Sequence, residues 1–238
     1  AKEGFKPFIT IYSTFLQRGF DQIIHDVCLM NLPVVFTIDR AGIVGNDGET
    51  HQGTFDISFL RFIPNMILLA PRDSETLHYA LQFTYTLQGP SAVRYPRGAF
   101  KQLDFQPTQF TLGKGEILKE GSSDKLFIGY GAGVGRAIDT EVLHDEDITI
   151  VDLRFVKPLD AQLLKNLANK YAKWYIFSDS QAQGGVGSAL LEFLNKHKIH
   201  NIELTTFEYE DIFIQHGDTK VIEEELGLLP EQLVKQIQ

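Results

Sequence analysis

The chain alternates between short, nearly continuous apolar runs and longer stretches in which apolar residues recur with helical spacing. The first pattern predicts buried strands, which in the first part of the chain cover residues 8–12, 34–38, 66–70 and 91–95. The second pattern predicts helices, which cover residues 13–27, 55–62 and 73–87. Apolar strands that alternate with helices are typical of a parallel sheet covered on both faces.

The same alternation returns after a break in the second part of the chain. Residues 99–111 form a polar stretch with Pro107, which indicates a linker. Beyond it, strands are predicted at residues 115–118, 126–130, 148–153, 174–178 and 202–206. Helices are predicted at residues 134–144, 160–171, 187–197 and 230–238. We therefore expect an α/β protein with two doubly wound domains, at residues 1–98 and 112–238.

The bulk composition narrows the class of protein. The length of 238 residues, the apolar fraction of 43% and the charged fraction of 22% are globular values. The net charge of −9 argues against nucleic acid or an anionic membrane as the main partner. Cys28 is the only cysteine, which excludes an intrachain disulfide and thiolate metal clusters. The chain has neither a membrane-spanning apolar run nor a signal-peptide pattern, so we expect a cytoplasmic protein.

The first residues predict a piece of a longer polypeptide. The chain opens on Ala1 rather than on methionine, and residues 1–7 are typical of the last turn of a helix, ended by Gly4 and followed by Pro7. We expect the chain to have been cut inside or just after that helix. The alternative is a natural short N-terminus from which methionine was removed.

Three predicted strand ends carry residues that suit a binding site. Tyr12 ends the first strand, Asp39 and Arg40 end the second, and residues 95–98, which include Arg97, end the fourth. Ligands of open α/β sheets gather at the carboxyl ends of strands, so Arg40 and Arg97 are expected to approach one pocket. Two guanidinium groups there would suit a phosphate. Each arginine taken alone is equally compatible with a surface ion pair.

The segment from Asp39 to Gly53 has the composition of a functional loop, although a long surface turn is the simpler alternative. Asp47 and His51 lie four residues apart within it, and a histidine there can relay a proton or hydrogen-bond a substrate hydroxyl. Phe15, in the preceding predicted helix, is either a core residue or a platform for a planar cofactor ring.

Two other glycine-rich segments follow strands. Residues 129–135 match a dinucleotide-binding fingerprint poorly, with Asp152 as the nearest candidate for its acidic residue. Residues 183–187 are predicted to serve tight packing between helix and strand or a contact with another domain. No Gly-Asp-Gly motif with a downstream Asn is present, so we predict no metal-binding residues in this chain.

Several motifs together are similar to those of one enzyme family. They cover residues 11–18, 21–22, 25–27, 39–45, 47–48, 50–53, 90–98, 184–188 and 223–228. Together they resemble the 1-deoxy-D-xylulose-5-phosphate synthase family of transketolase-like, thiamine diphosphate-dependent enzymes. Other transketolases share the Asp-Gly-x-Thr-His-Gln core of residues 47–52 but not the flanking motifs.

The resemblance implies three α/β domains, of which this chain would contain most of the second, pyrimidine-binding domain and all of the third, the transketolase C-terminal-like domain. It implies condensation of pyruvate with D-glyceraldehyde 3-phosphate with loss of CO2, in a homodimer that uses thiamine diphosphate and Mg²⁺. The product would feed isoprenoid, thiamine and pyridoxal phosphate synthesis.

Carried over by motif, Phe15 and Arg18 would contact the aminopyrimidine ring of the cofactor. The phosphate of glyceraldehyde 3-phosphate would be bound by Tyr12, Arg40 and Arg97. Asp47 and His51 would contact the reacting groups. The family's catalytic glutamate and its metal and diphosphate site would precede Ala1, so we expect this chain to be inactive without that N-terminal part.

Two other functions remain compatible with the sequence. One is a β-type subunit of a 2-oxo acid dehydrogenase-like enzyme, which has a similar two-domain plan. The other is a non-catalytic dimerisation or binding module.

Overall fold

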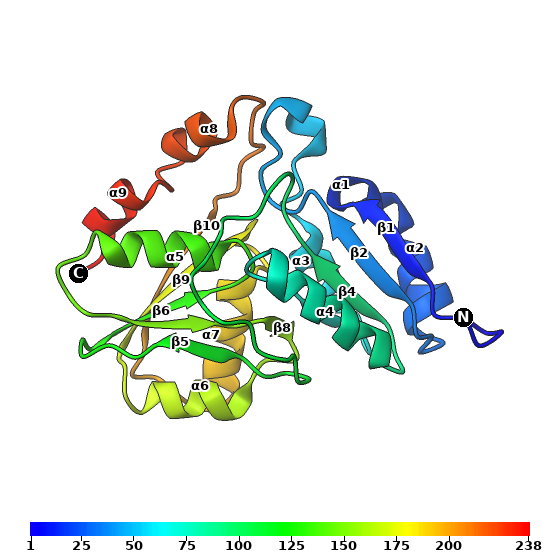
Figure 1. The fold of residues 1–238 in the computed structure, drawn as a ribbon, viewed down its shortest axis with the longest axis horizontal. Coiled ribbons are helices and arrows are strands. Elements are labelled where there is room, and N and C mark those ends of the chain that lie inside the picture. The colour runs from blue at the N-terminus through cyan, green and yellow to red at the C-terminus, as the bar shows by residue number, and fades with distance from the viewer.

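The computed structural model describes residues 1–238 and arranges them as two α/β halves side by side, with the two termini at opposite ends of the molecule (Figure 1). Each half is built on a five-stranded sheet, and the orders are β1-β2-β4-β3-β8 and β10-β9-β6-β7-β5. The predicted fold class of two α/β domains is therefore confirmed, although neither sheet is purely parallel.

The first sheet contains four parallel strands and one antiparallel strand, β8. Its strands are β1 (Phe8–Tyr12), β2 (Val35–Asp39), β3 (Ile67–Leu69), β4 (Ser91–Arg94) and β8 (Phe155–Lys157). The short β8 was not predicted from the sequence. It belongs to the second half by sequence but pairs with β3, so the first sheet is completed by a segment from beyond the linker.

The second sheet is parallel except for its edge strand β5. Its strands are β5 (Glu116–Lys119), β6 (Lys125–Gly129), β7 (Thr149–Asp152), β9 (Lys173–Gln181) and β10 (Glu203–Tyr209). The central strand β6 is buried along its whole length, as a continuous apolar run predicts.

Helices connect these strands and cover the sheets. The α-helices are α1 (Ser13–Leu16), α2 (Phe20–Gln22), α3 (Asp56–Leu60), α4 (Ser74–Thr86), α5 (Gly133–Val142), α6 (Ala161–Ala168), α7 (Val186–Lys196), α8 (Thr219–Glu225) and α9 (Pro230–Leu233). The 3₁₀ and π segments are η1 (Gln17–Gly19), η2 (Ile23–Cys28), η3 (Gly45–Asp47), η4 (Glu49–His51) and η5 (Val234–Gln236). Aspartates at 73, 160 and 218 cap α4, α6 and α8 through backbone N–H groups, as expected for helix N-caps.

Two local predictions differ from the structure. The single helix expected at residues 13–27 changes type along its length and ends in a π-helix. The α-helix gives way to a 3₁₀ segment at Gln17–Gly19, and Gly19, with a φ of −97° and a ψ of 10°, lies outside the α-helical range, in keeping with the weak helix propensity of glycine. At the N-terminus, residues 1–4 form a turn closed by a hydrogen bond of 3.0 Å from Gly4 N to Ala1 O, not a helical turn.

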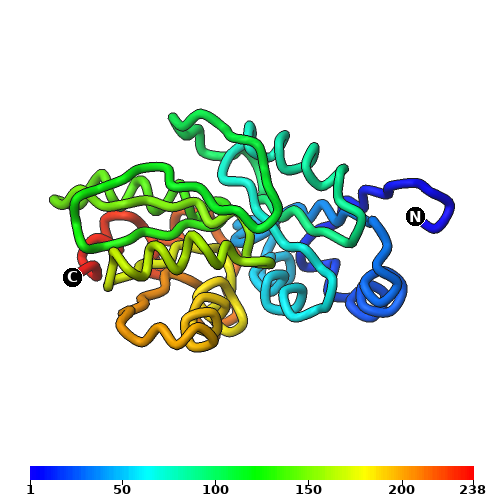
Figure 2. Tube along the Cα trace, turned by 90° about the horizontal axis from the view of Figure 1, so that it is seen from below, coloured from blue at the N-terminus to red at the C-terminus, as the bar shows by residue number.

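The core is continuous between the halves. One cluster of 30 buried apolar residues includes Ile57 and Leu60 of α3 together with Val186 and Leu190 of α7. Residues 99–111 contain no helix or strand, yet Phe110 is buried and its ring lies 5.9 Å from that of Phe155. The tube view shows this segment running along the two halves where they meet (Figure 2).

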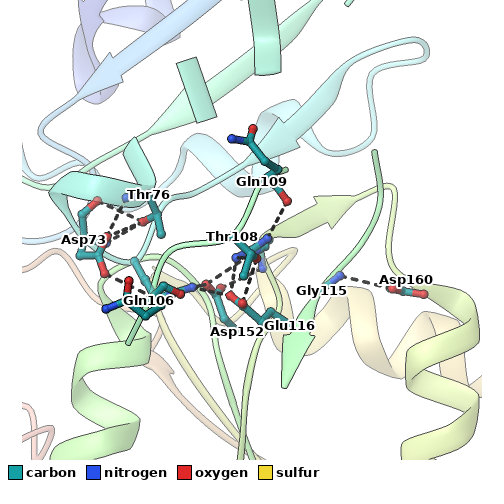
Figure 3. A network of polar contacts seen from close by, with 11 residues as sticks. Asp73, Thr76, Gln106, Thr108, Gln109, Gly115, Glu116, Asp152 and Asp160 are labelled. Carbon is teal, nitrogen blue, oxygen red and sulfur yellow. Dashed lines mark hydrogen bonds and ion pairs between the residues drawn. The ribbon is translucent and has the colours of Figure 1, made fainter. Parts of the chain in front are cut away.

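A buried network of charges also joins the halves (Figure 3). Arg72, which follows β3, donates hydrogen bonds from Nη1 to Glu116 at 2.7 Å and to Asp152 at 3.1 Å. Arg154 donates a second hydrogen bond to the same Glu116 carboxylate. Burial raises the pKa of Asp152, whereas the positive charges of Arg72 and Arg154 act to lower it. Since Asp152 is held inside this network, it is not placed to bind a ribose, and the dinucleotide alternative has no support.

The glycine-rich segments instead allow close packing. A Cβ on Gly133 would lie 2.1 Å from the carbonyl oxygen of Phe177, and a Cβ on Gly187 would lie 2.3 Å from Thr206. Both distances are shorter than van der Waals contact, so only glycine lets α5 and α7 approach the second sheet this closely. This agrees with the packing role predicted for residues 183–187.

Candidate functional site

The carboxyl ends of β1, β2 and β4 bring the predicted site residues to one edge of the first sheet. Tyr12 pairs with Asp39 in the β1–β2 register. Tyr95 N donates to Ile38 O at 3.0 Å, and Ala41 N donates to Tyr95 O at 2.9 Å. The residues that follow the three strands therefore start as neighbours, as the sequence predicted from the parallel order.

Arg40 and Arg97 converge on one carboxylate. The Oδ2 atom of Asp47 lies 3.4 Å from Arg40 Nε and 3.0 Å from Arg97 Nε. The Arg40 guanidinium also pairs with Asp39 and lies 3.8 Å from the centre of the Tyr12 ring, a cation–π distance. Arg40 adopts a φ of +60°, which is uncommon for a residue with a side chain. The structure therefore brings Tyr12, Arg40, Asp47 and Arg97 into a single cluster.

An aromatic group adjoins this cluster. The Phe15 ring stacks on Tyr12 with 5.0 Å between ring centres and meets the His51 ring edge-on at 5.2 Å. Thr50 Oγ1 lies 3.1 Å from His51 Nδ1, which leaves Nε2 as the ring nitrogen available to a ligand. The side chain of Phe15 is 38% exposed, so a planar group has access to it. Arg18 lies exposed in η1, outside these contacts.

The loop that carries Asp47 and His51 closes on itself at its base. Gly42 N donates to Gly53 O at 2.7 Å, and Gly53 N donates to Gly42 O at 2.8 Å. A Cβ on Gly53 would lie 1.9 Å from the carbonyl oxygen of Arg40, so glycine is required at this crossing. The base fixes where the two ends of the loop leave the sheet.

Residues on both sides of the same loop contact the second half. Buried Gln52 accepts a hydrogen bond from Val44 N at 2.8 Å and donates one to the carbonyl oxygen of Gln215 at 2.9 Å. A Cβ on Gly45 would lie 2.8 Å from Thr219 Oγ1. The loop is therefore packed against the segment that leads into α8.

A pocket of about 530 Å³ opens between the loop and the second half. Arg40, Arg97 and the loop line one side, and Arg136, Asp179 and Glu223 line the other. None of these last three residues was predicted from the sequence as a site residue. Asp179 lies inside β9, Arg136 follows the glycine-rich segment of residues 129–135, and Glu223 is far away along the chain, so no local pattern brings them to the pocket. Asp179 is buried, which raises its pKa, while Arg94 and Arg136 act in the opposite direction.

Within residues 1–238, no group of three or more His, Cys, Asp or Glu side chains has the arrangement of a metal site. None of the helices is long and apolar enough to span a bilayer.

Comparison with known proteins assigns both halves. Residues 1–102 match the transketolase pyrimidine-binding domain, and residues 113–233 match the transketolase C-terminal domain. The chain belongs to the transketolase family. The members of this family that carry a pyrimidine-binding domain are thiamine diphosphate-dependent enzymes.

Within the family, the chain is similar to 1-deoxy-D-xylulose-5-phosphate synthases. It is 77% identical over 237 residues to the synthase of Aliarcobacter butzleri and 61% identical over 238 residues to that of Sulfurimonas denitrificans. Each match covers 100% of this chain and 39% of the relative, so the chain corresponds to the C-terminal region of these proteins. The predicted resemblance to the C-terminal part of this synthase family is therefore confirmed.

A solved structure shows the same fold. A protein described as a split gene transketolase, inactive beta4 tetramer, superposes with a TM-score of 0.88 at 25% sequence identity. The match covers 98% of this chain and 76% of that chain. The relative arrangement of the two halves is thus one that occurs in a known transketolase chain.

Proposed function

We propose that this chain supplies the pyrimidine-binding and C-terminal domains of a 1-deoxy-D-xylulose-5-phosphate synthase, which condenses pyruvate with D-glyceraldehyde 3-phosphate and releases CO2. The observation that carries the proposal is the convergence of Arg40 and Arg97 on Asp47, beside Tyr12, at the end of the parallel strands. The identity to named synthases supports it.

The phosphate of glyceraldehyde 3-phosphate is proposed to bind between Arg40 and Arg97. Asp47 holds both Nε atoms and Asp39 holds Arg40 Nη1, so Arg40 Nη2 and the two outer nitrogens of Arg97 remain for an anion. The Tyr12 ring packs against the Arg40 guanidinium, and its hydroxyl would donate a hydrogen bond to the same anion. This arrangement selects a phosphorylated aldehyde over a neutral one.

Phe15 is proposed to hold the aminopyrimidine of thiamine diphosphate, with Arg18 beside it. The exposed part of the Phe15 ring fits a planar group, whereas none of the acidic clusters of this chain fits a metal ion. When bound, the cofactor supplies the electron sink for decarboxylation and for carbon–carbon bond formation. His51 lies edge-on to Phe15, where its Nε2 would donate a hydrogen bond or a proton to the reacting oxygen. Asp47 would orient the aldehyde end.

We infer that the chain needs further sequence to act. The motifs that would bind Mg²⁺ and diphosphate, and the catalytic glutamate, are expected in the remaining part of the synthase. That part is the proposed partner of this chain, in a homodimeric enzyme. The similar transketolase chain that is described as inactive supports this inference.

A chimera tests the proposal directly. The 237 matching residues of the Aliarcobacter butzleri synthase are replaced by this chain, and product formation from pyruvate and D-glyceraldehyde 3-phosphate is measured with thiamine diphosphate and Mg²⁺. We expect turnover by the chimera and none by the 238-residue chain alone. In the chimera, Arg97→Ala should raise KM for the aldehyde about tenfold and change KM for pyruvate little, since one charged hydrogen-bonding group is lost.

Lys119→Gln is the control, because Lys119 pairs with Glu141 within the second half and does not line the pocket. A folded chimera that forms no product, or an Arg97→Ala variant with an unchanged KM for the aldehyde, would contradict the proposal.

A further inference from the structure

The pocket beside the proposed phosphate site has a second wall, which belongs to the second half of the molecule. Arg136, near the start of α5, lies on that wall with 11% of its side chain exposed. Its Nη2 donates to Glu223 Oε1 at 2.8 Å, but its Nη1 has no hydrogen-bond partner. The Nη1 atom is buried, and a buried donor left unsatisfied at the wall of a cavity would gain from an acceptor that binds there.

The nearest carboxylate does not satisfy this donor. Asp179 Oδ1 lies 4.0 Å from Arg136 Nη1, beyond hydrogen-bond distance, and this oxygen also lacks a partner. Burial would lower the pKa of Arg136, but neighbouring Tyr209, Asp179 and Glu223 outweigh it and the pKa is raised. Arg136 therefore stays charged at any physiological pH.

The other buried arginines differ from Arg136 in their surroundings. Arg94 donates from Nε to Asp56 at 2.9 Å and from Nη2 to the carbonyl oxygen of Asp179 at 3.0 Å. Arg72 and Arg154 each have an unpaired Nε, but both donate hydrogen bonds to Glu116 and neither lines the pocket. Only the Arg136 side chain combines an unsatisfied donor with the cavity that Arg40 and Arg97 line.

We propose that Arg136 is a third phosphate-binding guanidinium, supplied by the second half to the pocket of Arg40 and Arg97. The inference rests on the proposed function, because it assumes that a phosphorylated substrate enters this pocket. Its guanidinium donates to a phosphate oxygen from the wall opposite the loop. Glu223 holds that guanidinium in place, and its carboxylate competes with the phosphate for the positive charge. The substrate site then spans both halves, and a shift between them changes substrate affinity.

Inorganic phosphate is the probe, titrated into the ¹⁵N-labelled 238-residue chain and followed by NMR. Arg136→Gln should weaken phosphate binding about tenfold, the effect of losing one charged hydrogen bond. Glu223→Gln should strengthen it about threefold, because the competing negative charge is removed while the amide can still accept a hydrogen bond. A purely structural role for the pair predicts instead that both variants weaken binding alike.

Lys119→Gln, which breaks a lysine–carboxylate pair within the second half and away from the pocket, should leave phosphate affinity unchanged. If Arg136→Gln fails to fold, Arg136→Lys replaces it, since lysine keeps the ion pair with Glu223 but lacks a second donor branch. The Arg136→Lys variant should also weaken phosphate binding.

Unchanged affinity in the folded Arg136 variant, or weakened affinity in Glu223→Gln, overturns the inference. Arg97→Ala separates the two proposals: if it weakens binding and Arg136→Gln does not, only this inference fails, and if it has no effect, the proposed phosphate site itself fails.

Discussion

Gln52 and Gln215 are joined by a hydrogen bond across the two halves of the molecule, with 2.9 Å between Gln52 Nε2 and the carbonyl oxygen of Gln215. The other end of the same amide accepts from Val44 N. One buried side chain thus fixes the shape of the loop and attaches it to the neighbouring half. The positions of Asp47 and His51 depend on this attachment.

The first prediction concerns this attachment. Gln52→Ala leaves the buried Val44 N–H without a partner, which costs about 1–3 kcal/mol, and it frees the Gln215 carbonyl, whose hydrogen bond is only partly buried. We expect faster amide hydrogen exchange at residues 42–48 and weaker phosphate binding, with the rest of the chain still protected. Gln17→Ala, at an exposed position, is the control. Unaltered exchange at residues 42–48 would show that the loop is held by other contacts.

The second prediction concerns the stacking of Arg40 on Tyr12. Tyr12→Phe keeps an aromatic face under the guanidinium, whereas Tyr12→Leu removes it, and a partly buried cation–π contact contributes about 1 kcal/mol. We expect Tyr12→Leu to weaken phosphate binding about fivefold more than Tyr12→Phe, measured by the same NMR titration. Equal effects of the two substitutions would mean that the hydroxyl matters and the ring does not.

The third prediction concerns a buried carboxyl in the second half. Glu208 accepts hydrogen bonds from Ser180 Oγ and from the backbone N–H groups of residues 186 and 187 at the start of α7. Burial nevertheless raises the pKa of Glu208 to about 7 from an ordinary value of 4.5, so the folded protein holds a proton that the unfolded chain releases. The stability contributed by this group is full below pH 4.5 and is lost as the pH rises to about 7.

Urea unfolding at pH 5 and pH 8 measures this effect. We expect the wild type to lose about 2 kcal/mol between these values through Glu208, and Glu208→Gln to lose correspondingly less. Glu231→Gln, in the first turn of α9, serves as the comparison. The assignment fails if Glu208→Gln and the wild type show the same dependence on pH.

The fourth prediction concerns the charges between the halves. Arg72→Met leaves Asp152 and Glu116 with one fewer cation in a buried position, and breaking a buried ion pair costs about 3–5 kcal/mol. Asp152→Asn removes one of the carboxylates left behind, so the double variant should be destabilised by clearly less than the sum of the single variants. Denaturant unfolding of all four proteins measures the coupling, and additive losses would argue against direct interaction.

The sequence predicted those parts of the site that depend on local patterns, namely strand ends and loop composition. Tyr12, Arg40 and Arg97 could be brought together because parallel strands end at one edge, and the loop from Asp39 to Gly53 could be recognised by its composition. The fold class followed from the spacing of apolar runs. The roles of these residues remain predictions, as do the domain boundaries at residues 98 and 112.

The sequence did not predict features that depend on distant partners. β8 has only three residues, too few for a pattern, and its pairing with β3 is set by how the halves meet. Arg136 directly follows the glycine-rich segment of residues 129–135, whose pattern is a poor match to a dinucleotide-binding fingerprint. Whether its guanidinium is satisfied depends on Glu223 and Asp179, which are far along the chain, so neither propensity nor spacing could reveal it.

The placement of β8 also affects how the protein is made. A chain emerges from the ribosome from its N-terminus, so β1 to β4 are available well before residues 155–157. Until then β3 is an open edge, and an exposed strand edge invites pairing with other chains. The first half is therefore expected to be most vulnerable to aggregation during synthesis, and a gene cut at the linker would leave that vulnerability permanent.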